Sequence, residues 1–168
     1  MTEKQKYRVL QEFEGFETRE YLPVVVADVV IASDRSSANN QAFRPLFNYI
    51  STNNISMTAP VLQEEIAKDE WKISFVMPAE MKLVDLPQPV STPVTLRQLQ
   101  SEQVAALRFS GDMNDSAVKV KEAKLLSLMK SHNLIPVGIS RVARFNPPWI
   151  PTFLRHNELL IPFTNAKD

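Results

Sequence analysis

The sequence of 168 residues has no cysteine, only three glycines and no excess of either charge. Without cysteine the protein can form no disulfide, no thiolate nucleophile and no cysteine-ligated metal, iron-sulfur or haem site. Nineteen basic residues balance nineteen acidic ones, and no block of like charge occurs. We therefore expect no nucleic-acid partner. Because no run of about 18 apolar residues is present, we also expect no membrane span.

The first ten residues, MTEKQKYRVL, contain no apolar core of about 7 to 15 residues as a signal peptide would. As written, the sequence predicts a cytoplasmic protein. A periplasmic or exported location would follow if a leader peptide had been removed. The length suits one domain, which we expect to cover residues 1–168.

Three strands are expected in the first half of the sequence. The β-branched run VVVADVVIA at residues 24–32 predicts a strand that is buried over most of its length. Apolar and other residues alternate at 55–61 and 71–77, which predicts two more strands with one apolar face each.

A helix is expected between these strands. Apolar residues recur at helical spacing over residues 39–52, and Ser36 and Ser37 precede them as capping candidates. Pro45 lies inside this segment. Because an interior proline costs about 3 kcal/mol relative to alanine, we expect a kink, or a helix that starts as late as Arg44.

The second half repeats this order with a period of about 80 residues. Strands are predicted at 94–99, 104–109, 137–145 and 159–163, and a helix runs from a cap at Asn114 or Asp115 to about His132. The pattern predicts an α+β fold in which duplicated β-α-β-β units form a mainly antiparallel, barrel-like sheet flanked by two helices. The two halves are expected at about residues 17–78 and 93–163.

The stretch ARFNPPWIPTFLRHNEL, residues 143–159, joins the last two predicted strands. Pro147, Pro148 and Pro151 exclude helix interior and central strand, so a stiff loop is predicted. The matching connection in the first half, residues 61–70, is free of proline and predicts a solvated hairpin turn. We expect the stiff loop to form the wall of a cleft; the alternative is that Trp149 plugs the end of the barrel.

Six motifs occur in a characteristic order: AFRPLFNYI, ISMTAPV, WKISFVMP, LPQP, RFSGD and ARFNPPWIPTFLRHNEL. In this order and approximate spacing the sequence resembles the SOUL haem-binding protein family. The resemblance implies two pseudo-symmetric halves, as in the effector-binding domains of bacterial regulators. It also implies binding of haem or a related tetrapyrrole in a surface hydrophobic cleft, near the first helix and the loop before the last strand.

This resemblance suggests particular residues for a haem site. Three aromatic residues are expected to form an apolar wall against a flat ring: Phe47, Trp149 and Phe153. Arg44 and Arg155 are the expected partners of two propionates. The alternative for these arginines is a solvated surface position or a salt bridge to Glu158.

His132 and His156 are weak candidates for an axial iron ligand. His132 is better explained as a cap at the end of the second helix, where its imidazole meets the helix dipole. His156 stands where the family more commonly has arginine, and a position that accepts arginine is expected to face solvent or a propionate. Coordination is not required, because covering about 300 Å² of apolar surface gains ~7.5 kcal/mol against an association cost of about 4 kcal/mol upward.

Non-enzymatic binding of haem or a tetrapyrrole, for carriage, buffering or delivery, is the function the sequence favours. The alternative is a sensor module for another flat hydrophobic small molecule, which would need a separate protein partner of unknown identity. No nucleophile, phosphate-binding or metalloprotease motif is found, so an enzyme is not expected. Asp28 is the one acidic residue in a strongly apolar run, and we expect it to point outward.

Overall fold

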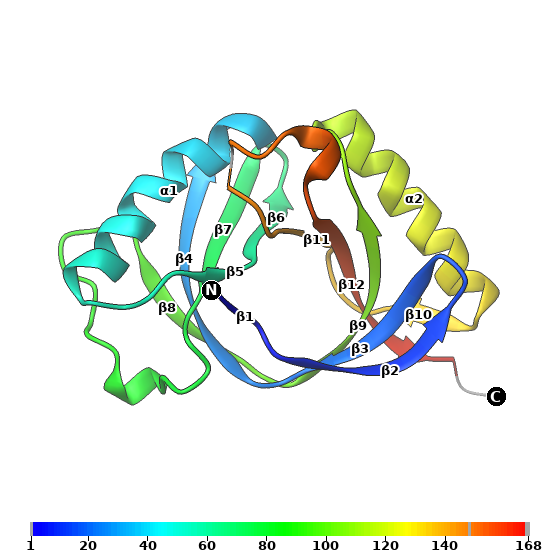
Figure 1. Cartoon of the computed structure of the whole chain (residues 1–168), viewed down its shortest axis with the longest axis horizontal. Coiled ribbons are helices and arrows are strands. Elements are labelled where there is room, and N and C mark those ends of the chain that lie inside the picture. Colours follow the sequence, from blue (N-terminus) through cyan, green and yellow to red (C-terminus); the bar gives the residue numbers. More distant parts are fainter. Residues whose placement is uncertain (1, 148, 167–168) are drawn as a thin grey trace.

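The computed structural model describes residues 2–147 and 149–166, and it has the predicted α+β architecture (Figure 1). A mainly antiparallel sheet curls into a half-barrel, and two helices flank it on the outside. The helices are α1 (Arg35–Thr52) and α2 (Asp115–Ser131), with short 3-10 turns η1 (Leu83–Asp85) and η2 (Thr152–Leu154).

The strands form one large sheet and one small one. They are β1 (Glu3–Lys4), β2 (Tyr7–Phe13), β3 (Phe16–Tyr21), β4 (Val24–Ala32), β5 (Thr58–Ala59), β6 (Val61–Ala67), β7 (Glu70–Val76), β8 (Thr95–Leu99), β9 (Glu102–Phe109), β10 (Leu134–Pro136), β11 (Arg141–Arg144) and β12 (Asn157–Asn165). The large sheet has the order β2-β3-β9-β12-β11-β6-β7-β4-β8, with β10 also beside β12. The strands β1 and β5 pair in parallel.

The strand order is symmetric about the central pair β6 and β11. Outward from β6 follow β7, β4 and β8, and outward from β11 follow β12, β9 and β3. The first strand of each half pairs with a strand of the other half: β3 pairs with β9, and β8 pairs with β4. Two copies of one strand-strand-helix-strand-strand unit give this order when they exchange their first strands.

The start predicted for α1 was wrong. The helix begins at Arg35, and Asp34 caps it by accepting a hydrogen bond at 2.8 Å from the backbone N–H of Ser37. Ala38 is fully buried, so the apolar face of the helix extends one turn further toward the N-terminus than the larger residues indicate. Pro45 lies inside the helix.

Two of the predicted strands also need correction. Only residues 58–59 of the segment 55–61 belong to a strand before β6, and β6 continues through most of the expected solvated turn. The turn itself consists of Lys68 and Asp69, and Asp69 has a left-handed φ of 54°. The segment 137–145 contains only β11, because β10 ends at Pro136. The second helix agrees with its prediction, with Asn114 as its cap.

The core has three parts. In the first, α1 packs on the outer face of its half of the sheet through Ala42, Leu46 and Ile50 against Val25, Ile73 and Phe75. In the second, α2 packs through Val118, Leu125 and Met129 against Leu107, Leu159 and Ile161. The third part is the inner face of the curled sheet, where both halves contribute Val26, Leu62, Val76, Val104, Ala106 and Leu160.

Asp28 belongs to the inner face, so the expectation that it points outward was wrong. It lies two residues from Val26 on β4, so both side chains point to the inner side of the sheet, and Asp28 is only 3% exposed. Its carboxylate accepts hydrogen bonds from the hydroxyl of Ser74 and, at 2.8 Å, from Nε of Arg97. The carboxylate is therefore buried and paired.

A second ion pair crosses the inner face. Arg19 on β3 donates two hydrogen bonds to Glu158 on β12, at 2.6 Å and 2.9 Å, and both residues are nearly inaccessible to solvent. The strand β9 lies between them. The hydroxyl of Tyr21 accepts a further bond from Arg19 at 2.9 Å. This pair ties an exchanged first strand to the last strand of the other half.

Replacing Arg19 with methionine is expected to lower the free energy of unfolding by about 3–5 kcal/mol, because Glu158 is left buried without its charged partner. Urea unfolding followed by circular dichroism measures this change. The control is Arg8→Met, which breaks an exposed pair with Glu20 and should cost about 0–1 kcal/mol. Equal losses in the two variants would contradict the assignment of Arg19.

Candidate functional site

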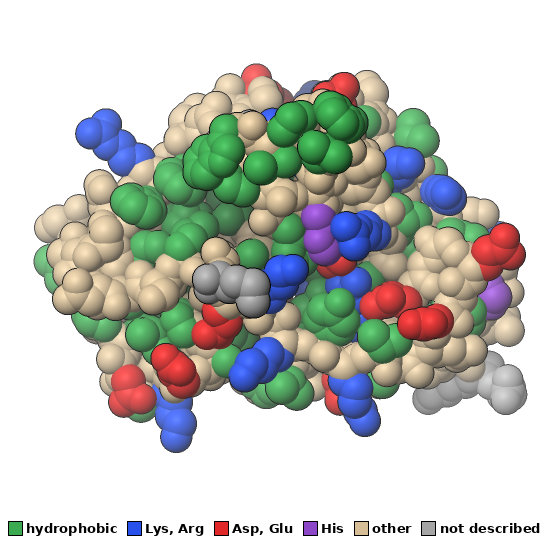
Figure 2. Space-filling model, viewed as in Figure 1, with side chains coloured by type: hydrophobic (Ala, Val, Ile, Leu, Met, Phe, Trp, Pro, Cys, Tyr) green, Lys and Arg blue, Asp and Glu red, His purple; other side chains and the backbone are tan. Residues whose placement is uncertain are grey.

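Five large hydrophobic side chains are exposed on α1 and on the proline-rich segment, residues 145–156. They are Phe43, Phe47, Trp149, Phe153 and Leu154, and we call them the apolar patch. Figure 2 shows hydrophobic side chains gathered over α1 and over this segment, along the upper edge of the view. Exposed apolar surface concentrated in this way is a candidate binding surface.

The α1 side of the apolar patch is held by the core. Phe43 and Phe47 lie one helical turn apart and stack, with ring centroids 5.7 Å apart and planes inclined by 10°. Phe43 also meets the edge of the buried Phe75, at 5.5 Å between centroids. The outer aromatic pair therefore has a fixed position before any ligand arrives.

The proline-rich segment is fastened at several points. The backbone N–H of Gly111 donates to the carbonyl of Thr152 at 2.9 Å, with Gly111 at a left-handed φ of 94° that glycine accommodates. Nε of Arg155 donates to the carbonyl of Ile150 at 2.7 Å. Pro148, one of the three prolines, lies outside the described residues. These bonds give the segment a defined shape next to the start of α2, as Figure 1 shows.

Trp149 does not plug the barrel. Its side chain is 79% exposed, and Phe153 is 72% exposed. A plug would be buried among the residues of the inner face, so this alternative was wrong. The expectation that these rings form a wall beside a ligand stays a prediction.

Two arginines lie close together at the base of the proline-rich segment. Arg144 ends β11 and is opposite Asn157 of β12. Because Arg155 precedes Asn157 by two residues in an extended chain, Arg155 and Arg144 are directed to the same, outer side. Burial and the charge of Arg155 lower the pKa of Arg144. Arg155 was predicted from the sequence as a site residue and Arg144 was not, although Arg144 lies only three residues before Pro147.

Arg44 is exposed on α1. It lies two residues from both Ala42 and Leu46, which are buried, so about 200° of helical rotation separates it from each of them. Arg44 therefore lies on the solvent side of the helix, and its role with a propionate stays a prediction.

The two histidines lie in different parts of the fold. His132 is the C-cap of α2, and its ring packs against Phe13 and Phe16 at 4.4 Å and 5.6 Å between centroids. The helix is about 25 Å long, and the proline-rich segment lies beside its opposite end. His132 is therefore remote from the apolar patch.

His156 is held on the inner side of the sheet. Its ring stacks on Phe145 at 4.2 Å, and its Nε2 lies 2.8 Å from a carboxylate oxygen of Glu158. Glu158 thus has Arg19 and His156 as partners. Burial raises the pKa of Glu158, but the hydrogen bonds from Arg19 and His156 outweigh this effect and lower it below its usual value.

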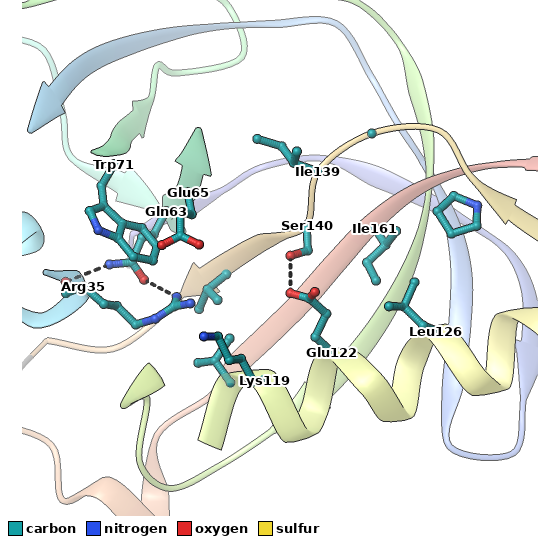
Figure 3. Close-up of a pocket in the computed structure, with 14 residues that line it drawn as sticks. Arg35, Gln63, Glu65, Trp71, Lys119, Glu122, Leu126, Ile139, Ser140 and Ile161 are labelled. Atoms are coloured by element: carbon teal, nitrogen blue, oxygen red, sulfur yellow. Dashed lines mark hydrogen bonds between the residues drawn. The ribbon is translucent and has the colours of Figure 1, made fainter. Parts of the chain in front are cut away.

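A cavity of about 330 Å³ lies between the helices, and Figure 3 shows its lining. Arg35 lies over the ring of Trp71 at 4.4 Å and donates to Gln63 at 3.1 Å. Ser140 donates to Glu122 at 2.7 Å on the other side. A second cavity of about 250 Å³ lies near the N-terminus. The residues predicted for the haem site line neither cavity, so the apolar patch is a separate surface.

Among residues 2–147 and 149–166, no group of three or more histidine, aspartate or glutamate side chains is placed to hold a metal ion. Within the same residues, neither helix is long and apolar enough to cross a membrane. What this part of the chain offers a ligand at the apolar patch is therefore an apolar surface with arginines beside it.

A family model described as SOUL heme-binding protein matches residues 2–162, nearly the whole chain. No curated protein matches the sequence significantly.

Solved structures share the fold at low sequence identity. The C-terminal domain of EcmrR has a TM-score of 0.74 at 9% identity, covering 95% of this chain and 99% of that one. A hydrolase from Listeria innocua has a TM-score of 0.62 at 12% identity, covering 88% and 91%. The structure of SAV2435 bound to tetraphenylphosphonium has a TM-score of 0.54 at 8% identity, covering 89% and 93%. These likenesses establish the fold.

The lowered pKa of Glu158 predicts a stability that depends on pH. A carboxyl group with a depressed folded pKa contributes stability that is present above its unfolded pKa of about 4.3, and this is lost as the pH falls through the folded pKa. The free energy of unfolding, measured in urea from about pH 6 to pH 3, should fall more steeply for the parent protein than for Glu158→Gln. Glu20→Gln, at an exposed pair, is the control and should follow the parent. Parallel curves for the parent and Glu158→Gln would contradict this assignment.

Proposed function

The chain belongs to the SOUL haem-binding protein family, and we propose that it binds haem or a related tetrapyrrole at the apolar patch without catalysing a reaction. Carriage, buffering or delivery of the ligand would be its role. The observation that carries this proposal is the exposure of five large hydrophobic side chains on α1 and on the proline-rich segment.

The apolar patch suits a flat ring. The α1 pair Phe43 and Phe47 is stacked and anchored on the core, and Trp149 and Phe153 stand on a segment that its prolines and hydrogen bonds hold in place. Preformed walls lower the cost of ordering side chains when a ligand binds. Covering about 300 Å² of apolar surface would gain ~7.5 kcal/mol, which exceeds the lower estimates of the association cost.

The propionates of a tetrapyrrole need cationic partners at the edge of this surface. Arg155 lies in the proline-rich segment and Arg44 on α1, so each belongs to an element that carries part of the apolar patch. Guanidinium groups bind carboxylates through paired, charge-assisted hydrogen bonds. In this proposal the arginines fix the orientation of the ring and the aromatic residues supply most of the affinity.

An iron bond from a histidine is not part of the proposal. His156 would have to give up its contact with Glu158 on the inner side of the sheet, and His132 lies at the far end of α2. Haem held in this way would be bound by the aromatic residues and the arginines, without a protein ligand to its iron. Such a mode of binding suits carriage and delivery.

The second candidate function is an effector-binding module for another flat hydrophobic molecule. It is supported by the shared fold with SAV2435, whose structure contains tetraphenylphosphonium. In the present chain the inner-face carboxylates of Asp28 and Glu158 are both paired with arginines, which argues against a cationic ligand there. A sensor role would require a separate protein partner.

Haemin titration tests the proposal. The parent protein at micromolar concentration should give a saturable change in the Soret band, and Trp149→Ala and Phe47→Ala should each weaken binding by about tenfold, because each removes an aromatic wall worth about 1.5 kcal/mol. His132→Ala and His156→Ala should leave the Soret shift in place. Val120→Ala removes an exposed apolar residue of α2 and serves as the control. The absence of any saturable change would reject the haem proposal and favour the other effector.

A further inference from the structure

We propose that Arg144 is an anion anchor at the base of the apolar patch, so that this surface selects flat apolar molecules that carry carboxylates over neutral or cationic ones. The inference rests on the proposed function, because it assumes that the apolar patch is the binding surface. It adds the chemical class of the ligand and a residue that the sequence analysis did not identify.

The position of Arg144 follows from the sheet. Val142 belongs to the outer core under α2, and Arg144 is two residues further along β11, so the arginine is also on the outer face. It is opposite Asn157 on one side and Val61 on the other. Arg144 is half-buried, so part of its side chain is shielded from solvent.

The outer face connects Arg144 to both sides of the apolar patch. On one side, Val61 is paired with Phe75, and the ring of Phe75 is in a T-shaped contact with the ring of Phe43. On the other side, Arg155 bonds the carbonyl of Ile150, the residue that follows Trp149. Arg144 thus stands between the α1 aromatic residues and the proline-rich segment.

Arg144 differs from the other arginines that the sheet and helices bury. Arg19 pairs with Glu158, Arg97 with Asp28, Arg141 with Glu102 and Arg35 with Asp115. Within residues 2–147 and 149–166, Arg144 forms neither an ion pair nor a side-chain hydrogen bond.

The charged group near Arg144 is the like charge of Arg155. Two neighbouring guanidinium groups repel each other, and a buried charge without a partner is costly. A bound carboxylate would relieve both costs, whereas a neutral or cationic ligand would not. The same geometry suits a propionate of a tetrapyrrole and any other carboxylate on a flat apolar body.

The experiment compares haemin with its dimethyl ester, in which the carboxylates are masked, using absorbance titrations of the full chain. The parent protein should bind haemin at least about tenfold more tightly than the ester. Arg144→Gln should remove most of this difference by weakening haemin alone, since the variant loses a charge-assisted hydrogen bond to the carboxylate. Arg144→Lys keeps the charge and should retain haemin binding within a few fold. Arg8→Gln, on the distant edge strand β2, is the control and should bind like the parent.

The outcomes separate this inference from the proposed function. If the parent binds haemin and Arg144→Gln binds it equally well in a folded state, with a cooperative melt like that of the parent, the inference is overturned and the proposed function stands. If the parent binds neither tetrapyrrole, the proposed function fails, and 8-anilinonaphthalene-1-sulfonate replaces haemin as an anionic probe, with Nile red as its neutral match. If Arg144→Gln binds the sulfonate more weakly than the parent but binds Nile red as the parent does, the anchor is supported. If Arg144→Gln binds the sulfonate as tightly as the parent does, the anchor is rejected. If Arg144→Gln does not fold, Arg144→Lys is titrated with haemin and with the ester at low and high salt. A preference for haemin over the ester that does not change with salt overturns the anchor.

Discussion

Both halves of the chain contribute to the inner face of the curled sheet. Each half places one arginine there, and a carboxylate of the other half neutralises its charge. Arg19 and Arg97 sit on the two exchanged first strands, opposite Val104 and Val26, which lie in corresponding strands of the symmetric order. Arg97 takes its carboxylate from Asp28 on the neighbouring strand β4. The position on β9 that corresponds to Asp28 is Ala106, so Arg19 reaches across β9 to Glu158 on β12. Each exchanged strand is thereby bonded to the opposite half by an ion pair whose carboxylate is buried.

This use of the inner carboxylates has a consequence for binding. A groove with free, buried acidic groups would attract a lipophilic cation, but here each of the two is already satisfied by a guanidinium at hydrogen-bonding distance. The apolar patch lies on the outer surface, where the two halves differ in the connection between their last two strands. One half joins its last two strands by the short turn at Lys68 and Asp69, and the other uses the proline-rich segment of residues 145–156. Because of that difference, only one of the two corresponding connections carries the exposed rings of Trp149 and Phe153, together with Arg155.

The sequence predicted the parts of this fold that depend on local patterns. Alternating apolar residues predicted β7, the β-branched run predicted β4, and the helical spacing with Asn114 predicted α2. It did not predict the exchange of first strands, because pairing between distant strands leaves no local pattern. Alternation shows which residues share a face but not which face is buried, and for this reason Asp28 was expected outside and Arg144 was missed. Of the predicted site residues, the structure brings Trp149, Phe153 and Arg155 together on one segment through its own hydrogen bonds, and it separates the two histidines.

A site of this kind divides affinity and selectivity between different residues. Phe43 and Phe47 stack on each other and Phe43 contacts the core, so a flat ligand pays little to order this pair, but any flat apolar molecule gains from the same surface. Selectivity among flat ligands must then come from a protein group that is in an unfavourable environment when no ligand is bound. Arg144 is such a group, because it is half-buried, next to a like charge and without an acidic partner within the described part of the chain. A carboxylate that reaches it removes a cost that the protein carries when empty, and release restores that cost, so the ligand is held more tightly without any bond to iron.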